Sequence, residues 1–270
     1  MEHFIRYKDS KIQYWKYGTG PVPLVCLHGF EQDGSRFAFL ERAMGKRFTM
    51  YAISLPFHGH TQWKEGLVFL PEDLYAIIQS MIPQQGGGIT PIHLLGYSIG
   101  GRLALAFFER YPAFVKAIYL AAPDGLHANP WYWFATQTAL GNRLFQRTMH
   151  KPAWLIAVSK GLVKRKMLDA SLGKFAEYYL GNEDVRMQLY QRWISFRKFV
   201  PHLNIIKKLL VIHQVKMHIL FGKQDGIIRY QTGEKFQRGH EDSIRIILLE
   251  TGHHLMHERY LPNWKDLLDG

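Results

Sequence analysis

The sequence predicts an α/β fold, in which a mostly parallel, twisted sheet carries helices on both faces. Short apolar runs recur along the chain, and segments with helical spacing separate most of them. Strands that alternate with helices in this way form parallel sheets whose faces the helices cover. Residues 125–210 interrupt the alternation once, with helical runs and no clear strand. We therefore expect a core domain of residues 1–124 and 211–270 and a helical insertion of residues 125–210.

The predicted strands are apolar or alternating runs bounded by turn residues. Residues 10–17 alternate loosely and are expected to form an edge strand, which a turn at Gly18–Pro21 ends. Residues 24–27 are continuously apolar and are expected to form a short buried strand. The remaining predicted strands are 48–55, 91–95, 115–122, 215–221 and 244–249.

The predicted helices carry apolar residues at helical spacing. Residues 71–82 also begin with an acidic first turn, which suits the positive end of the helix dipole. The other predicted helices of the core are 35–44, 102–109, 230–238 and 255–268, and the last is expected to break near Pro262.

Composition excludes several classes of protein. The chain has 270 residues, of which 47% are hydrophobic, so it can bury a large core and is not expected to be disordered. Its first residues lack the apolar segment of a signal peptide, and no run approaches the roughly 18 apolar residues of a membrane span. The single cysteine, Cys26, allows no internal disulfide and is expected in the core. We therefore expect a cytoplasmic protein.

Net positive charge is concentrated in the insertion. The net charge is +12, and residues 125–210 hold 14 Lys and Arg against 4 Asp and Glu, whereas the remainder is nearly balanced. No recognised nucleic-acid motif accompanies the charge, so no nucleic-acid partner is expected. We interpret it first as a solvated face, second as attraction of an anionic substrate, and third as docking on acidic lipid with the help of the insertion's tryptophans.

The pentapeptide Gly96–Gly100 carries the first candidate for chemistry. It lies between the predicted strand 91–95 and the predicted helix 102–109, with Ser98 at the sharp turn between them. A serine at such a turn has strained backbone angles and presents its hydroxyl, and glycines two residues before and after it let strand and helix approach closely. The helix N-terminus favours negative charge beside the serine. Ser98 is therefore a candidate nucleophile, and the alternative is an ordinary turn serine.

A serine nucleophile needs a base to accept its proton and a third group to orient that base. In an open parallel sheet such groups gather at the carboxyl ends of the strands. Asp225 and His253 each follow a later predicted strand, and the order serine, aspartate, histidine is the one expected for this architecture. Asp124 also follows a strand end and stays an alternative acid.

Two further histidines, His254 and His257, lie close to His253 and raise the alternative of a zinc site. Adjacent histidines face apart in most conformations, and no carboxylate–histidine ligand set accompanies them. We expect no metal here and interpret His254 and His257 as residues at the start of the last helix.

Together these motifs resemble those of the α/β-hydrolase fold superfamily, and the resemblance covers nearly all of the chain outside the insertion. His28-Gly29-Phe30 is similar to the family's oxyanion turn, and the insertion lies where the family has a helical cap. Gly222-x-x-Asp225 and Gly252-His253 are similar to the family's acid and base motifs.

The resemblance implies a role for each of these residues. Ser98 attacks the substrate, His253 takes and returns the proton, and Asp225 fixes the imidazole tautomer. The backbone N–H groups of Phe30 and Ile99 hold the oxyanion. The implied function is an esterase-like serine hydrolase that cleaves an ester or related acyl bond of a small molecule through an acyl-enzyme, without a cofactor.

Two other functions remain open. The stretch from Gly96 to Arg102 is similar to that of the menaquinone-pathway SHCHC synthase, a lyase whose triad acts as a base on an anionic substrate and whose arginine aids binding. A C–C bond hydrolase on the same scaffold belongs to this alternative. The third function is that of a non-catalytic member that binds a small ligand.

The candidate substrate-binding residues come from the elbow and the insertion. Tyr97 lies beside the nucleophile, and Arg102 lies one helical turn beyond it. For Arg102 the alternative is a salt bridge between helix and loop, and for Tyr97 it is simple packing. Trp131 and Trp133 either line an apolar pocket or form a small core within the insertion. We make no prediction of oligomeric state.

Overall fold

The computed structural model describes residues 1–83, 90–127, 130–164 and 180–269, apart from the side chains of Trp131 and Leu162. These residues form two compact units. The first consists of Met1–His127 and Lys198–Gly270, and the second of Ala128–Arg197.

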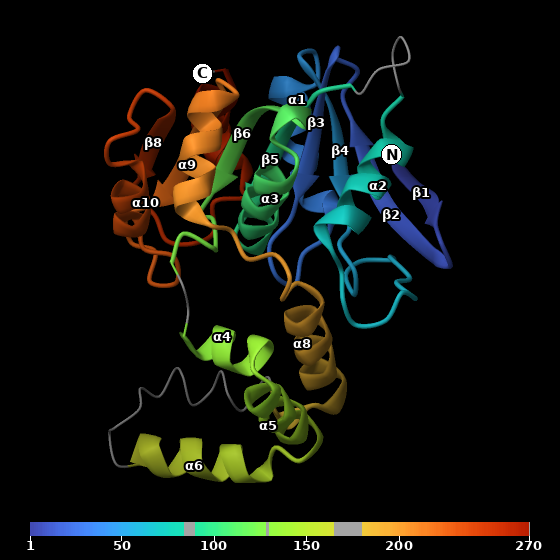
Figure 1. Cartoon of the computed structure of the whole chain (residues 1–270), viewed down its shortest axis with the longest axis vertical. Coiled ribbons are helices and arrows are strands. Elements are labelled where there is room, and N and C mark those ends of the chain that lie inside the picture. The colour runs from blue at the N-terminus through green and yellow to red at the C-terminus, as the bar shows by residue number, and fades with distance from the viewer. Residues whose placement is uncertain (84–89, 128–129, 165–179, 270) are drawn as a thin grey trace. The chain divides into compact units, whose positions relative to one another are not determined.

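One sheet organises the first unit, and within the described residues it has eight strands in the order β1-β2-β4-β3-β5-β6-β7-β8 (Figure 1). Strands β1 and β2 pair antiparallel, as do β2 and β4, and every other neighbouring pair is parallel. The predicted fold class is thus confirmed. The strands are β1 Glu2–Tyr7, β2 Ser10–Tyr17, β3 Val22–Leu27, β4 Phe48–Ile53, β5 Ile92–Tyr97, β6 Val115–Ala121, β7 Lys216–Gly222 and β8 Ile244–Leu249.

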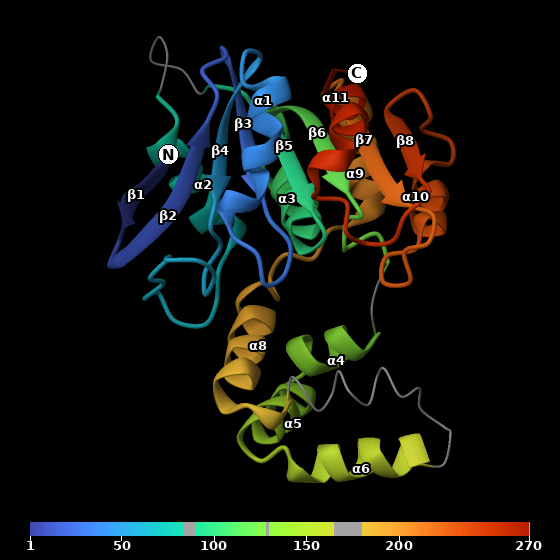
Figure 2. The ribbon, with the colours of Figure 1, turned by 180° about the vertical axis from the view of Figure 1, so that it is seen from behind.

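Helices cover both faces of this sheet. Helices α2, α3 and α9 lie on the face toward the viewer in Figure 1, and α1 and α11 lie on the face seen in Figure 2. The described helices of the first unit are α1 Glu41–Met44, α2 Pro71–Met81, α3 Ile99–Arg110, α9 Leu203–Ile212, α10 Tyr230–Gln237 and α11 Leu261–Asp269. Three 3₁₀ turns accompany them within the described residues: η1 Gly34–Leu40, η2 Pro112–Phe114 and η3 Glu258–Tyr260.

Strand β5 and helix α3 form the centre of the unit, because both are apolar nearly throughout. Strand β5 pairs with β3 on one side and β6 on the other, and all its residues except His93 are buried. Ten of the twelve residues of α3 are buried as well, so the helix is packed on most of its circumference. Burial at about 25 cal/mol per Å² of apolar surface makes this pair a large part of the stabilising core. The turn between them, at Ser98, is therefore rigidly supported.

Two sequence-based expectations about the chain ends were wrong. The strand predicted at 10–17 exists, but it is not the edge strand, since β1 lies outside it. Strand β1 alternates between exposed and half-buried residues, so it lacks the continuous apolar run of a buried strand. The last helix begins at Leu261 rather than 255, and Pro262 lies in its first turn, where proline is tolerated, rather than at a break.

The predicted insertion ends too late. Residues 198–210, which we assigned to it, belong to the first unit, where α9 packs on α3. The sequence of α9 has a helical rather than a strand pattern, and it follows other helical segments, so it resembles the sequence of the insertion. Its buried residues, Ile206 and Leu210, show that tertiary packing rather than periodicity decides which unit holds it.

The second unit is helical throughout its described residues, with α4 Pro130–Gln137, α5 Ala139–His150, α6 Ala153–Lys164 and α8 Glu183–Ser195. The Phe145 ring lies 5.3 Å from that of Tyr190 and 5.5 Å from that of Trp193, so α5 and α8 share an aromatic contact. The Tyr132 hydroxyl of α4 donates to the Trp193 carbonyl. In neither unit does a described helix combine the length and apolar character needed to cross a membrane.

Candidate active site

Ser98 occupies a strained turn between β5 and α3. Its φ is 53° and its ψ is −117°, a combination that only glycine adopts without cost. The turn is held in place because Ser98 N–H donates to the Ala121 carbonyl and Ser98 C=O accepts from Asp124 N–H. A Cβ at Gly100 would lie 2.0 Å from the Leu27 carbonyl oxygen, so this position requires glycine. The predicted elbow geometry is therefore present.

This strain predicts a stability difference between two inactive variants. Ser98→Gly and Ser98→Ala both remove the hydroxyl, but only alanine keeps the Cβ that disfavours positive φ. We expect the glycine variant to be more stable than the alanine variant by about 1 kcal/mol, after the entropy cost of glycine in the unfolded chain is subtracted. Urea unfolding of the two purified variants measures the difference. An alanine variant of equal or greater stability would show that the turn is not strained.

The side chains of Ser98, His253 and Asp225 form one hydrogen-bonded chain. His253 follows β8, and its Nδ1 lies 2.7 Å from Asp225 Oδ2, while its Nε2 lies 3.2 Å from Ser98 Oγ. Because the carboxylate can only accept, Nδ1 carries the ring proton and Nε2 is left to accept from the serine hydroxyl. The structure thus brings together the three residues that the sequence selected from different strand ends.

Asp225 is held as a buried carboxylate. Its side chain is 0% exposed, against 14% for His253. Burial acts to raise the pKa of Asp225, but the His253 hydrogen bond and the backbone N–H groups of Ile228 and Ile227 outweigh it, so the pKa is lowered. Those two N–H groups donate to Oδ1 and leave Oδ2 for the histidine. The arrangement fixes both the charge and the direction of the carboxylate.

Asp124, the alternative acid, has other partners. Its Oδ2 lies 3.3 Å from Arg102 Nη1, and its Oδ1 accepts from the Gly125 N–H. Arg102 is buried, so the contact is a salt bridge between α3 and the loop after β6. This is the structural alternative that we considered for Arg102, and a role in substrate binding stays a prediction.

Tyr97 packs behind the catalytic histidine candidate. Its hydroxyl donates to the His253 carbonyl at 3.0 Å, and the two rings lie 5.4 Å apart. Burial, followed by the charge of Asp225, raises the pKa of Tyr97 to about 12. The phenol therefore stays neutral and holds the backbone of the base, which the sequence did not indicate.

The two predicted oxyanion donors come from the start of α3 and from the turn after β3. Ile99 is the first residue of α3, so its N–H has no acceptor within the helix. Phe30 follows β3, and the carbonyl of the preceding Gly29 lies 2.7 Å from His28 Nδ1. His28 Nε2 in turn accepts from the Leu55 N–H, so Nδ1 must carry the proton and donate. His28 thereby orients the peptide that bears the Phe30 N–H, a role that sequence reasoning missed.

The remaining candidates are spread over both units. Trp133 belongs to α4 of the second unit and is 56% exposed, and the Trp131 side chain lies outside the described residues. His254 is exposed, and His257 accepts from Arg259 N–H at the start of η3, as expected of a residue at a helix start. The described residues contain no group of three His, Cys, Asp or Glu side chains that could hold a metal. Cys26 lies buried in β3, and burial raises the pKa of its thiol.

Comparison with known proteins connects this geometry to a family. The family described as the alpha/beta hydrolase family matches residues 24–261, from β3 to the start of α11. This chain belongs to the alpha/beta hydrolase family. The match includes the elbow, both later strand ends and the helical unit.

Relatives of this family member include hydrolases of esters. A Bacillus subtilis protein named only as an uncharacterized hydrolase is 19% identical over 93% of this chain and 91% of its own length. A monoacylglycerol lipase from Bos taurus is 22% identical over 98% of this chain and 80% of its own length. A solved esterase from Thermogutta terrifontis has a TM-score of 0.65 at 19% identity, over 100% of this chain and 98% of its own, and shows the shared fold.

Proposed function

We propose that this chain is a serine hydrolase that cleaves an ester or related acyl bond of a small molecule through an acyl-enzyme on Ser98. The observation that carries the proposal is the hydrogen-bonded chain from Ser98 Oγ through the His253 ring to Asp225. Such a chain gives a serine hydroxyl the base that it needs to become a nucleophile.

In the proposed reaction, Ser98 Oγ attacks the substrate carbonyl carbon while His253 Nε2 takes the hydroxyl proton. The negative charge that develops on the carbonyl oxygen is stabilised by the N–H groups of Phe30 and Ile99. The tetrahedral intermediate collapses, the C–O bond to the leaving alcohol breaks, and His253 returns its proton to that alcohol. Water then repeats the sequence on the acyl-enzyme and releases the acid.

The comparisons support an ester as the substrate class. The bovine relative is named a monoacylglycerol lipase, and the Thermogutta terrifontis structure is that of an esterase. Both names describe hydrolysis of a carboxylic ester, which agrees with a serine, histidine and aspartate chain. We further propose that the helical unit caps the strand ends and admits the substrate, and that its positive charge favours anionic substrates. A cytoplasmic location is proposed on the ground that the one cysteine is buried and unpaired.

A fluorophosphonate probe tests the proposal directly. The probe phosphonylates an activated serine, so the wild-type protein is expected to be labelled and Ser98→Ala is expected to lose labelling completely. Intact-mass spectrometry measures the fraction labelled, and peptide mapping identifies the residue. Ser80, whose hydroxyl donates to the Ala76 carbonyl on the surface of α2, provides the matched control as Ser80→Ala. Labelling that survives in Ser98→Ala would remove Ser98 as the nucleophile.

The lyase and C–C hydrolase alternatives use the same catalytic chain. The stretch from Gly96 to Arg102 favours the lyase, but the salt bridge between Arg102 and Asp124 supports a structural role for this arginine. Turnover of p-nitrophenyl esters by the wild-type protein supports the esterase. Elimination of pyruvate from the menaquinone precursor, with no ester turnover, supports the lyase instead.

A further inference from the structure

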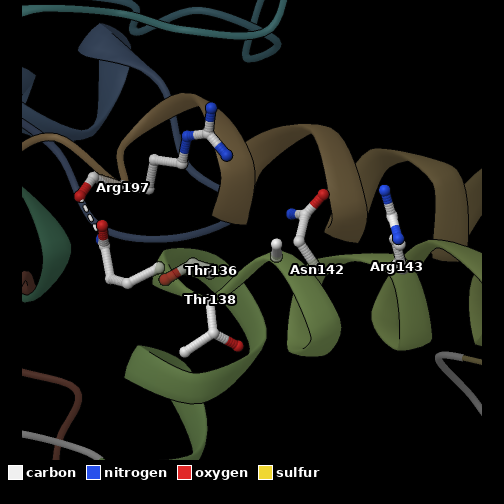
Figure 3. Close-up of a pocket in the computed structure, with 7 residues that line it drawn as sticks. Thr136, Thr138, Asn142, Arg143 and Arg197 are labelled. Carbon is white, nitrogen blue, oxygen red and sulfur yellow. Dashed lines mark hydrogen bonds between the residues drawn. The ribbon is translucent and has the colours of Figure 1, made fainter.

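The helical unit holds an open pocket of about 370 Å³, where α4 ends and α5 begins, facing the end of α8 (Figure 3). This size falls within the range of small-molecule sites. None of the proposed catalytic residues lines it, so an inference about this pocket does not rest on the proposed hydrolase reaction. Its lining consists of Thr136, Gln137, Thr138, Ala139, Asn142, Arg143 and Arg197.

Several polar groups of the lining already have partners within the unit. The hydroxyls of Thr136 and Thr138 donate to carbonyls one turn earlier in α4. The side-chain amide of Gln137 donates to the backbone carbonyl of Arg197, which joins the end of α4 to the end of α8. These contacts fix the shape of the pocket and leave few groups to bind a ligand.

Two buried donors of the described lining are left without a partner. Asn142 Nδ2 and Arg197 Nε are shielded from solvent, and neither has an acceptor among the described residues. A buried donor without an acceptor is costly, so a pair of them at one pocket indicates a missing acceptor. In Figure 3 the side chains of Asn142 and Arg143 extend from α5 toward α8, from which Arg197 follows. Two guanidinium groups and one amide therefore border the same space.

Among the described residues, no carboxylate neutralises these arginines. Neither Arg143 nor Arg197 forms an ion pair with a described residue, and the sequence has no Asp or Glu from Gly125 to Leu168. The acidic residues of the described helical unit are Glu183 and Asp184, in the first turn of α8, at the opposite end of that helix from the pocket. The pocket thus combines two positive charges with buried donors, and none of its described lining residues is acidic.

From this combination we propose that the pocket binds a phosphate group. Guanidinium groups present paired N–H donors that match phosphate oxygens, and hydrogen bonds between charged partners are the stronger class. A phosphate monoester carries a charge of about −1.5 to −2 at neutral pH, which two arginines balance, whereas a carboxylate carries only one. The Asn142 amide supplies a further donor to a third oxygen.

Titration of the full chain with inorganic phosphate tests the proposal. Binding is followed by calorimetry and by the ¹⁵N-resolved signals of Arg Nε–H and Asn side-chain amides. We expect Arg143→Gln and Arg197→Gln each to weaken phosphate binding by about tenfold or more. Arg147→Gln is the matched control, because Arg147 is exposed on the same helix one turn beyond Arg143 and does not line the pocket. Circular dichroism of each variant checks folding. Because Arg143 is exposed, Arg143→Gln is expected to fold and still tests the site if Arg197→Gln does not fold.

Each other outcome decides against the proposal or refines it. Equal weakening in Arg147→Gln would show a response to overall charge rather than a site, and would overturn it. Acetate that binds as tightly as phosphate, or no phosphate binding at all, would overturn it too. Hexyl phosphate separates the two sources of the group. Tighter binding than inorganic phosphate supports the phosphate of a larger organic molecule, and equal binding supports the free ion.

Discussion

Asp225→Asn is expected to lower kcat for an ester substrate by about 10³- to 10⁴-fold, with little change in KM. The reason lies in the two backbone N–H groups that donate to Oδ1 of Asp225. In the variant the amide oxygen stays with these donors, so the amide NH₂ faces His253 Nδ1. That ring nitrogen must then accept, and the proton moves to Nε2, where it blocks transfer from Ser98. Steady-state kinetics with a p-nitrophenyl ester measures the loss.

Asp124→Asn is the matched control, since it makes the same change at the other strand end. Asp124 contacts Arg102 and the Gly125 N–H rather than the histidine, so we expect less than a tenfold effect on kcat. Asp124→Asn is instead expected to lower the free energy of unfolding, because the buried Arg102 loses a charged partner, and removing one member of a buried pair is destabilising. Thermal unfolding of both variants separates the two effects. A larger kcat loss in Asp124→Asn than in Asp225→Asn would transfer the role of the acid to Asp124.

The catalytic candidates could be predicted because each follows a parallel strand. Strand ends of a parallel sheet meet at one edge, so order and spacing in the sequence were enough to select Ser98, Asp225 and His253. The same reasoning failed for β1, because a short, half-exposed antiparallel strand has no continuous apolar run. The C-terminal boundary of the insertion was mispredicted for another reason: α9 is an apolar helix, and its contact with α3 decides to which unit it belongs.

Side chains that act through tertiary contacts left no signal in the sequence. Tyr97 was a candidate as a neighbour of the nucleophile, yet its hydroxyl reaches the carbonyl of His253, 156 residues away. Asn142 lies in α5 and Arg197 follows the end of α8, and neither belongs to a motif, so only the packing of α5 against α8 brings their donors to one pocket. Periodicity places residues on faces of helices, but it does not specify which unpaired donors meet across two helices.

His28 is expected to control the oxyanion turn through its tautomer. Removing the hydrogen bonds to the Gly29 carbonyl and from the Leu55 N–H in His28→Phe frees the Gly29–Phe30 peptide to rotate, and leaves the buried Leu55 N–H without this acceptor. We expect kcat to fall by about 10²-fold, since loss of one oxyanion donor costs 10²- to 10³-fold and rotation only misaligns it. The lost hydrogen bonds should also lower the free energy of unfolding by about 1–3 kcal/mol.

The split between kinetic constants distinguishes positioning of the turn from a general loss of structure. Because the oxyanion forms only in the transition state, KM for the ester should stay nearly constant while the affinity for a boronic acid analogue falls with kcat/KM. His28→Gln keeps one donor and one acceptor, so it should recover part of kcat. A parallel rise in KM, or no recovery in the glutamine variant, would mean that His28 supports the fold of the loop without orienting the Phe30 N–H.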